Sequence, residues 1–334
     1  MLKISKELFD HENKLNSLKN NFLDQNISNS LIFYGNKGIG KCTFSYCLIN
    51  QIYKELDNNN YNHHKNLIYN STHPNIKIIN KNIDPKTKKI KNYITIDQIR
   101  EIELLLHKST IDNLPKFIII DSADDLNINS SNAILKILEE PTNNSYLILI
   151  SHQFSQILPT IRSRCVKIKF SNVNFDNFNK ILNSQIDYSD DENIKFLFDL
   201  SGGSPGIAIN IYNHNIKDLF ETLLMLFKEK RKLSSDLNEV SIKVSKYNNE
   251  EFSIYLSIIK FILINTIKIN LGINLTNLLN KKIYHSLNEI SMYLDNKISI
   301  KVLNYINLYE KNLYIFNLDK KIFNLNLFSN LSHN

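Results

Sequence analysis

Residues 35–42 have the composition of a phosphate-binding loop with one changed position. The pattern G-x-x-x-x-G-K-[ST] uses glycines so that backbone N–H groups can surround a polyphosphate, and a lysine to neutralise the β- and γ-phosphates. The glycines of this loop are Gly35, Gly38 and Gly40, and the lysine is Lys41. Cys42 replaces the hydroxyl that would hold Mg²⁺, and sulfur is a poor ligand for that hard cation. The loop therefore predicts a nucleotide-binding fold whose nucleotide chemistry is impaired.

Asp121 is the second residue suited to this chemistry, because it ends the apolar run Phe117–Ile120. Proteins with a phosphate-binding loop place at this point the acid that orders Mg²⁺. In ATPases with a second acid at the next position, that residue polarises the attacking water, but this chain has Ser122, which cannot act as a carboxylate base. Asp124 and Asp125 are expected to begin the next turn. The alternative is an ordinary buried strand that ends in a polar residue.

Residues 1–170 alternate short apolar runs with amphipathic stretches, which is typical of an α/β fold with a parallel sheet. Uninterrupted apolar runs suit strands that helices bury on both faces. The expected strands are residues 31–34, 76–79, 117–120, 146–150 and 165–170. Helices are expected at residues 43–54, at residues 97–107 with Asp97 as N-cap, and from Ser130 or Ser131 to Glu140, just before Pro141.

After Phe170 the strand patterns nearly vanish, and helical periodicity continues to about Phe328. A glycine- and proline-containing break at residues 201–206 divides this part. The predicted domains are residues 1–170, 171–225 and 226–334. Apolar side chains at helical spacing are expected to form a core in the last domain: Phe252, Tyr255, Leu256, Ile259 and Leu263. Two charged stretches, Lys86–Lys91 and Asp187–Glu192, are expected to be solvated loops.

The composition is that of a globular protein, with 43% hydrophobic and 22% charged residues. The net charge is +7, and nearly all of this excess lies in residues 1–170, which is compatible with contact to nucleic acid. Three cysteines form neither a disulfide framework nor a zinc cage and fit a reducing cytoplasm. The most apolar stretch, Ile254–Ile267, is expected to be too short to span a bilayer. A soluble cytoplasmic protein is therefore expected.

The most specific local signal is Leu158–Cys165, which contains Ser163-Arg164-Cys165. This segment resembles the clamp-loader branch of the AAA+ family, whose Ser-Arg-Cys motif supplies an arginine finger to a neighbouring subunit. The other motifs follow in the order of that family: Asp10-His11-Glu12, the glycine loop, His73-Pro74, Asp121–Asp124 and Asn132–Pro141. The resemblance is strong over about residues 8–210. It implies an AAA+ domain with a parallel sheet (1–170), a small helical lid domain (171–225) and a C-terminal helical collar domain (226–334).

The resemblance gives Arg164 the role of a finger that acts on the nucleotide of a neighbour. A guanidinium has the fixed charge and planar fork that stabilise charge developing on a γ-phosphate. The alternative is a salt bridge at the start of the last strand. Arg162 is a weaker candidate and could simply face solvent or DNA.

The chain departs from ATP-hydrolysing members of the family at three positions: Cys42, Ser122 and Gly206. Gly206 stands where those members carry a nucleotide-sensing arginine. Ser151-His152 occupies a polar sensor position at the end of the fourth expected strand, so that element is retained in form.

A cysteine-rich zinc module found in several members of the family has no counterpart in this sequence. The histidines of that region, His63, His64 and His73, are expected to be surface residues and not ligands. We therefore expect no zinc and no required cofactor, while Lys41 and the loop glycines leave ATP binding open.

The resemblance implies a non-hydrolysing stator of the bacterial sliding-clamp loader, a subunit that holds a motor subunit in place and donates Arg164 to its ATP. Its partners would be the gamma/tau motor subunits and the delta subunit of a hetero-oligomeric ring, with the clamp and primed DNA reached through the assembly and no membrane contact. DNA polymerase activity would belong to the holoenzyme. The alternatives are a divergent clamp-loader ATPase that tolerates Cys42 and an adaptor that senses nucleotide without turnover.

Overall fold

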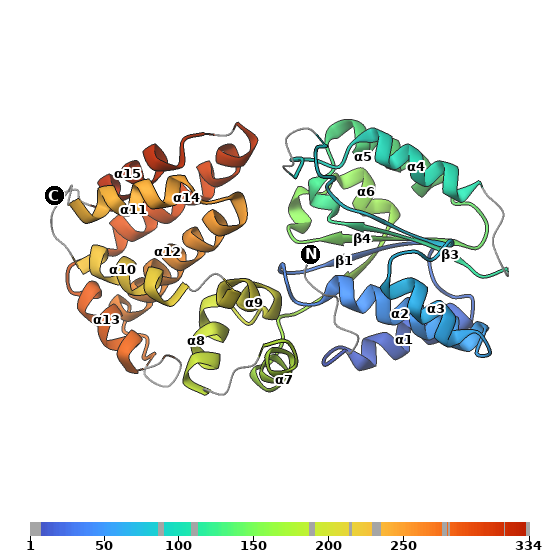
Figure 1. The fold of residues 1–334 in the computed structure, drawn as a ribbon, viewed down its shortest axis with the longest axis horizontal. Helices are drawn as coiled ribbons and strands as arrows, with labels where there is room; N and C mark the ends of the chain where they lie inside the picture. Colours follow the sequence, from blue (N-terminus) through green and yellow to red (C-terminus); the bar gives the residue numbers. More distant parts are fainter. Residues whose placement is uncertain are drawn as a thin grey trace. The chain divides into compact units, whose positions relative to one another are not determined.

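The computed structural model describes residues 8–85, 90–107, 113–186, 191–213, 216–228, 235–275, 279, 281–316 and 318–331 (Figure 1). The chain forms two compact units, residues 1–180 and residues 181–334. The expected boundary between residues 225 and 226 stays a prediction. Residues 86–89 and 187–190, which form most of the two expected charged loops, lie outside the described residues.

Five parallel strands form the sheet of the first unit, in the order β2-β3-β4-β1-β5. The strands are β1 (Ser30–Tyr34), β2 (Ile76–Ile79), β3 (Lys116–Asp121), β4 (Ser145–Ser151) and β5 (Val166–Lys169). All five were predicted, the first four from uninterrupted apolar runs and β5 from an alternating pattern, and no end differs by more than one residue. A parallel sheet in this order, with a glycine loop after β1, the neighbour of the central strand β4, is an AAA+ α/β fold. The expected fold class is confirmed.

Two layers of helices cover the sheet (Figure 1). One face carries α1 (Glu12–Leu23), α2 (Lys41–Leu56) and α3 (Tyr61–Tyr69), and the other carries α4 (Ile96–Leu106), α5 (Ile128–Glu139) and α6 (Pro159–Arg164). Alternate residues of β3 enter opposite cores: Phe117 and Ile119 pack with α1 and α2, whereas Ile118 and Ile120 pack with α4 and α5. Burial on both faces explains why the strands read as continuous apolar runs.

The caps of two helices differ from the sequence-based expectation. The N-cap of α4 is Thr95 and not Asp97, because Thr95 and Gln98 form a reciprocal capping box. The N-cap of α5 is Asn127, whose Oδ1 accepts a hydrogen bond from the Ser130 N–H at 2.8 Å. Ser130 and Ser131 therefore lie inside the first turn of α5, and the prediction that one of them caps the helix was wrong.

The second unit is helical in all of its described elements. These are α8 (Asp191–Ser201), α9 (Pro205–Asn213), α10 (Ile216–Lys228), α11 (Ser235–Ser245), α12 (Asn249–Asn270), α13 (Lys281–Ser291), α14 (Asn296–Ile315) and α15 (Lys320–Leu331). Helix α7 (Phe175–Gln185) crosses the boundary between the two units.

Helix α12 forms the centre of the second unit. Its predicted core residues Phe252, Tyr255, Leu256, Ile259 and Leu263 are all fully buried. The Tyr255 hydroxyl donates to Asn324 of α15, whose amide donates to Ser241 of α11, so three helices share one buried polar chain. In the described part of the chain, α12 is the one helix long and apolar enough to cross a membrane. The expected length limit was wrong, since the helix has 22 residues, but 61% of its apolar window is buried among other helices, as in a core helix.

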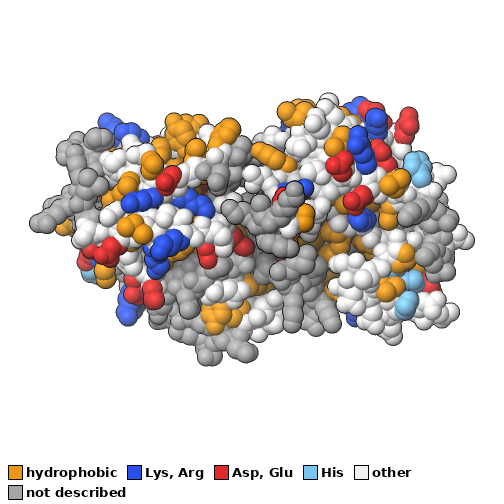
Figure 2. Space-filling view, turned by 45° about the horizontal axis from the view of Figure 1, so that its top comes forward, with side chains coloured by type: hydrophobic (Ala, Val, Ile, Leu, Met, Phe, Trp, Pro, Cys, Tyr) orange, Lys and Arg blue, Asp and Glu red, His pale blue; other side chains and the backbone are white. Residues whose placement is uncertain are grey.

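Charged side chains are mixed in sign over the face drawn in Figure 2. Lysine and arginine side chains alternate there with aspartate and glutamate within each unit, and no single broad basic area appears on that face. The positive net charge is therefore not gathered on this face into the kind of patch that binds nucleic acid through phosphates.

Candidate nucleotide site and finger arginine

The polar ends of three neighbouring strands meet at one edge of the sheet. Strand β4 pairs with both β1 and β3, all in parallel, so their carboxyl ends lie side by side. The glycine loop follows β1, Asp121 ends β3, and Ser151-His152 ends β4. The tertiary structure thus brings three of the predicted site elements together, at the edge where α/β proteins bind ligands.

The glycine loop has the backbone that its composition predicts. Gly35, Gly38 and Gly40 all have positive φ, and Gly40 is the N-cap of α2. A Cβ at Gly35 would lie 2.3 Å from the carbonyl oxygen of Phe170, so only glycine fits there. The loop therefore retains the form of an anion-binding loop at a helix N-terminus.

Lys41 is turned back into the loop and is only 3% exposed. Its Nζ donates to the carbonyl oxygens of Gly35 at 2.6 Å and Asn36 at 2.5 Å. Burial lowers the pKa of Lys41 to about 8, although Asp121 and Asp124 favour its charged form. The amine that would meet a phosphate is already satisfied by the backbone of its own loop.

Cys42 and Asp121 lie against each other at the predicted Mg²⁺ position. Burial raises the pKa of the Cys42 thiol well above its usual value, and the neighbouring Asp121 raises it further. Burial also raises the pKa of Asp121, while its contacts with Cys42 and Lys41 oppose that shift. A protonated thiol donates to the carboxylate instead of binding a cation. The predicted loss of the magnesium hydroxyl therefore has a structural counterpart.

The residues after Asp121 form a turn, as predicted for Asp124 and Asp125. The Ser122 hydroxyl donates to Asp125 at 3.0 Å, and Lys81 forms an ion pair with the same carboxylate, also at 3.0 Å. Asp124 accepts hydrogen bonds from the Ser151 hydroxyl at 2.8 Å and from the backbone N–H groups of the two residues that follow. Sequence reasoning missed this role of Asp124, which fixes the loop after β4.

His152 faces the site from the end of β4. Its Nε2 lies 3.9 Å from Asp121 Oδ1, and its Nδ1 is buried without a hydrogen-bond partner. Burial lowers the pKa of His152 to about 3, and the positive charges of Lys41 and Lys37 lower it further. The sensor position therefore carries a neutral imidazole.

Arg164 lies at the C-terminal end of α6 and contacts residues outside the loop. Its guanidinium pairs with Glu139 of α5 at 2.6 Å and donates to the Thr160 carbonyl oxygen at 3.0 Å. Both side chains of this ion pair are partly exposed, 38% for Arg164 and 50% for Glu139. Arg162 instead stacks over the Phe154 ring at 5.4 Å. Gly206 lies in α9 of the second unit, so its relation to the loop stays a prediction.

The histidines of the expected zinc region are placed differently from the prediction. His63 is exposed, but His64 and His73 are each 5% exposed. The Asn75 N–H donates to His73 Nδ1, so the neutral His73 ring carries its proton on Nε2 and donates to His64 Nδ1 at 3.0 Å. His64 then donates from Nε2 to Asp57 at 3.0 Å. The prediction of surface residues was wrong for these two rings because they form a buried hydrogen-bonded chain.

Within the described ranges, no group of three or more histidine, cysteine, aspartate or glutamate side chains is arranged to hold a metal ion. The expectation that the protein needs neither zinc nor another cofactor stays a prediction.

Comparison with known proteins finds a family that this chain resembles. The model of the DNA polymerase III delta subunit family matches residues 10–174. Over that span, this chain is similar to the DNA polymerase III delta-subunit family. The match covers every site element described above except Gly206.

Curated relatives agree with this family. The DNA polymerase III subunit delta' of Pseudomonas aeruginosa is 30% identical over 152 residues, 46% of this chain and 44% of that protein. The delta' subunit of Bacillus subtilis is 28% identical over 46% of this chain and 45% of that protein. The chain thus matches less than half the length of these two relatives. A gamma subunit from Buchnera aphidicola is 26% identical over 77% of this chain and 76% of that protein.

Among solved structures, a gamma subunit-related protein of Thermotoga maritima covers 96% of this chain and 99% of its own. It is 17% identical, with a TM-score of 0.46.

Proposed function

We propose that this chain is a delta'-type subunit of a bacterial sliding-clamp loader that does not hydrolyse ATP itself and donates Arg164 to the nucleotide of a neighbouring ATPase subunit. The match to the delta-subunit family model and the similarity to delta' and gamma subunits support the clamp-loader role. The gamma/tau and delta subunits are the proposed neighbours, and the clamp and primed DNA are reached through the assembly.

The acids at and just after the end of β3 are Asp121, Asp124 and Asp125, and each of them already has partners within the chain. This observation carries the non-hydrolysing part of the proposal. Asp121 lies against Cys42 and Lys41, Asp124 accepts from the loop after β4, and Asp125 accepts from Ser122 and pairs with Lys81. A general base must be free to accept a proton from the attacking water. Because Ser122 replaces the usual second acid, none of these carboxylates is left for that task.

The exposure of Arg164 supports its role in trans. An exposed ion pair contributes only about 0–1 kcal/mol, so Arg164 can leave Glu139 at little cost. A bidentate contact with a γ-phosphate is charge-assisted and stronger. The guanidinium is thus held near the surface by a contact that a neighbour's nucleotide can replace.

Reconstitution with the motor subunits tests the finger. Arg164→Ala should leave assembly intact but lower the clamp- and DNA-stimulated ATPase, with single-turnover hydrolysis at the served interface slowed about 10³-fold. Arg162→Ala is the matched control, because it removes an arginine from the same short helix. An unchanged ATPase in the assembly with Arg164→Ala would contradict the proposal.

An ATPase assay on the purified chain tests whether it lacks hydrolytic activity of its own. It should hydrolyse no ATP above the level of its own Lys41→Ala variant. Turnover that depends on Lys41 would show instead that the chain is a divergent ATPase that tolerates Cys42.

The intact glycine loop favours a second candidate, an adaptor that binds ATP without turnover. All three loop glycines keep the positive φ that lets N–H groups face an anion. Titration with ATP, with and without Mg²⁺, distinguishes the adaptor from the stator. Micromolar binding would identify the adaptor, whereas the stator does not need it.

A further inference from the structure

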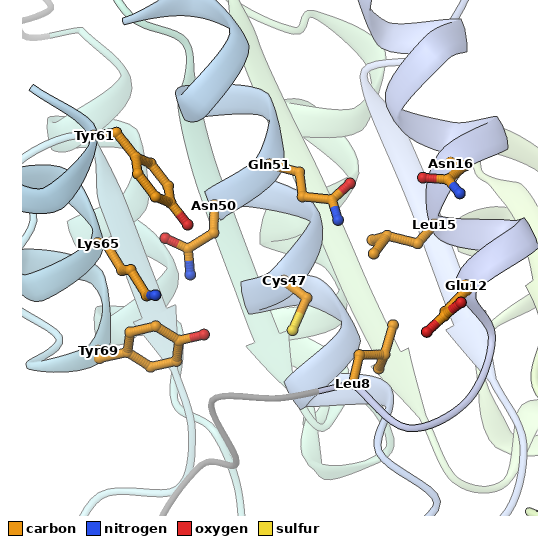
Figure 3. Close-up of a pocket in the computed structure, with 10 residues that line it drawn as sticks. All are labelled: Leu8, Glu12, Leu15, Asn16, Cys47, Asn50, Gln51, Tyr61, Lys65 and Tyr69. Atoms are coloured by element: carbon orange, nitrogen blue, oxygen red, sulfur yellow. The ribbon is translucent and has the colours of Figure 1, made fainter. Parts of the chain in front are cut away.

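Helix α6, which carries Arg164, has only six residues. An isolated helix of this length is unstable in water, so its position depends on packing and on the chain that enters it. That chain comes from β4 through residues 152–158, which include the 3₁₀ helix Phe154–Gln156. Figure 3 shows a groove of about 380 Å³ over α2, between α1 and α3, on the other face of the sheet. None of its lining residues belongs to this entering segment, so a ligand there would not touch it.

Asp124 joins the start of the entering segment to the turn after β3. Its Oδ1 accepts hydrogen bonds from the Ser151 hydroxyl at 2.8 Å and from the Gln153 N–H at 3.2 Å, and its Oδ2 accepts from the His152 N–H. Hydrogen bonds to a carboxylate are about twice as strong as those between neutral groups. One side chain therefore fixes three consecutive residues at the point where the chain leaves the sheet.

Weaker and less directional contacts connect the rest of the segment to α6. The Phe154 ring stacks on Tyr34 with centroids 4.4 Å apart, and the Arg162 guanidinium lies over the same ring at 5.4 Å. A cation–π contact is weak when it is partly exposed. Ile157 and Ile161 are buried in the core, but apolar burial is non-directional. The hydrogen bonds to Asp124 are thus the directional contacts that define how the chain enters α6.

We propose that Asp124 is a positioning residue for the finger: it fixes the chain that enters α6, and with it the place from which Arg164 reaches a neighbour's nucleotide. This inference rests on the proposed function. Asp124 acts only through the entering segment, whereas Arg164 makes the contact with the γ-phosphate. A displacement of about 1 Å at a reacting group can slow a reaction about 10²-fold, so a loosened segment should be measurable without loss of the fold.

Asp124→Asn tests this anchor with little change in size. The amide keeps one oxygen acceptor but places an NH₂ group against an N–H donor, so at least one of the three hydrogen bonds is lost. Asp125→Asn is the matched control. It makes the same change at the next residue, whose carboxylate accepts from Ser122 and pairs with Lys81 instead.

Two measurements follow the anchor and the finger separately. In the full chain, hydrogen exchange of the His152 and Gln153 amides should quicken about tenfold in Asp124→Asn and stay unchanged in Asp125→Asn. In the assembly reconstituted with the motor subunits, Asp124→Asn should slow single-turnover hydrolysis at the served interface about 10- to 100-fold, and Asp125→Asn should not. Combined with Arg164→Ala, Asp124→Asn should slow it no further, because nothing is left to position. A merely structural role would slow both backgrounds alike.

Three results would overturn the proposal: a wild-type rate for Asp124→Asn where Arg164→Ala is slow, equal slowing by Asp124→Asn with and without Arg164, or equal slowing by Asp125→Asn. A wild-type rate for Arg164→Ala would instead overturn the proposed function itself. If Asp124→Asn fails to assemble, Ser151→Ala removes one of the three hydrogen bonds and should slow hydrolysis about threefold. An unchanged rate in that variant would also contradict the positioning role.

Discussion

At the scale of single residues, Cys42 changes the chemistry of an otherwise intact loop. Its thiol is kept protonated by burial and by Asp121, so it adds neither a hydroxyl nor a thiolate to the cation position. The loop backbone and Lys41 remain in place beside it. Under the proposed function, binding and turnover are separable in this site, because the loop backbone and Lys41 are present whereas Ser122 offers no carboxylate base.

Cys42→Thr should raise the affinity for Mg²⁺-ATP about tenfold without producing turnover. The hydroxyl is a ligand that Mg²⁺ prefers, whereas Ser122 still supplies no base. Fluorescent ATP titration with and without Mg²⁺ measures the affinity, and phosphate release measures turnover. Cys47→Ser, one and a half turns further along α2, is the control and should change neither. Hydrolysis by Cys42→Thr would show that a base is present after all.

The buried histidines predict a dependence of stability on pH. Burial and the neighbouring histidines lower the pKa of His73 to about 4, below its value near 6.5 in the unfolded chain. Between these values the unfolded state binds the extra proton, so His73 should lower the free energy of unfolding by about 1.4 kcal/mol for each pH unit from 6.5 towards 4, in addition to the similar contribution of His152. Protonation would also put an N–H on His73 Nδ1 directly facing the Asn75 N–H.

Urea unfolding at several pH values measures this slope. His73→Asn should reduce the slope by about 1.4 kcal/mol per pH unit, and His63→Asn should not, because His63 is exposed. Equal slopes in wild type and His73→Asn would show that His73 does not titrate in this range.

At the scale of elements, α5 connects the two ends of the functional region. Its N-terminal turn follows the turn of Asp124 and Asp125, and its last residue, Glu139, holds Arg164. The start of α5 is set by Asn127, whose side chain accepts from the Ser130 N–H in an extended backbone conformation. A secure cap therefore keeps both the β3 turn and Glu139 in position.

Asn127→Ala should destabilise the first unit by about 1 kcal/mol, which is the usual cost of losing an N-cap. Denaturant unfolding followed by circular dichroism measures the change. Ser131→Ala should cost less, because the Ser131 side chain is not the cap. A larger loss for Ser131→Ala would restore the cap that was predicted from the sequence.

At the scale of the whole molecule, the two units contribute different properties. The first unit holds the loop, His152 and Arg164, and the second holds a core around α12. Several side chains of the second unit are apolar and exposed, among them Leu271, Met292, Tyr293, Leu308 and Phe316. Exposed apolar side chains of this kind fit the proposed collar role, in which helices of neighbouring subunits cover them.

Glu139→Gln should leave the stimulated ATPase of the reconstituted assembly at or above the wild-type value. The change removes the carboxylate that holds Arg164 in the free chain, and an exposed pair contributes only about 0–1 kcal/mol to stability. The same assay with Arg164→Ala is the comparison. If both variants lost activity equally, the ion pair itself, and not a finger acting in trans, would be what the assembly needs.

The sequence by itself determined the strands and the glycine loop, because each depends on residues close together in the chain. Apolar runs predict buried strands, and the spacing of Gly35, Gly40 and Lys41 predicts an anion-binding loop. The same short-range patterns predicted the core face of α12 but could not place His64 and His73 inside the protein.

Only the tertiary structure decided what the site residues contact. Asp124 accepts a hydrogen bond from the N–H of His152, which is 28 residues further along the chain. Arg164 of α6 pairs with Glu139 of α5. Such contacts depend on how the parallel strands and their helices bring distant residues together. Burial then sets the protonation of Lys41, Cys42 and His152, since desolvation is a property of the packed fold and not of the local sequence.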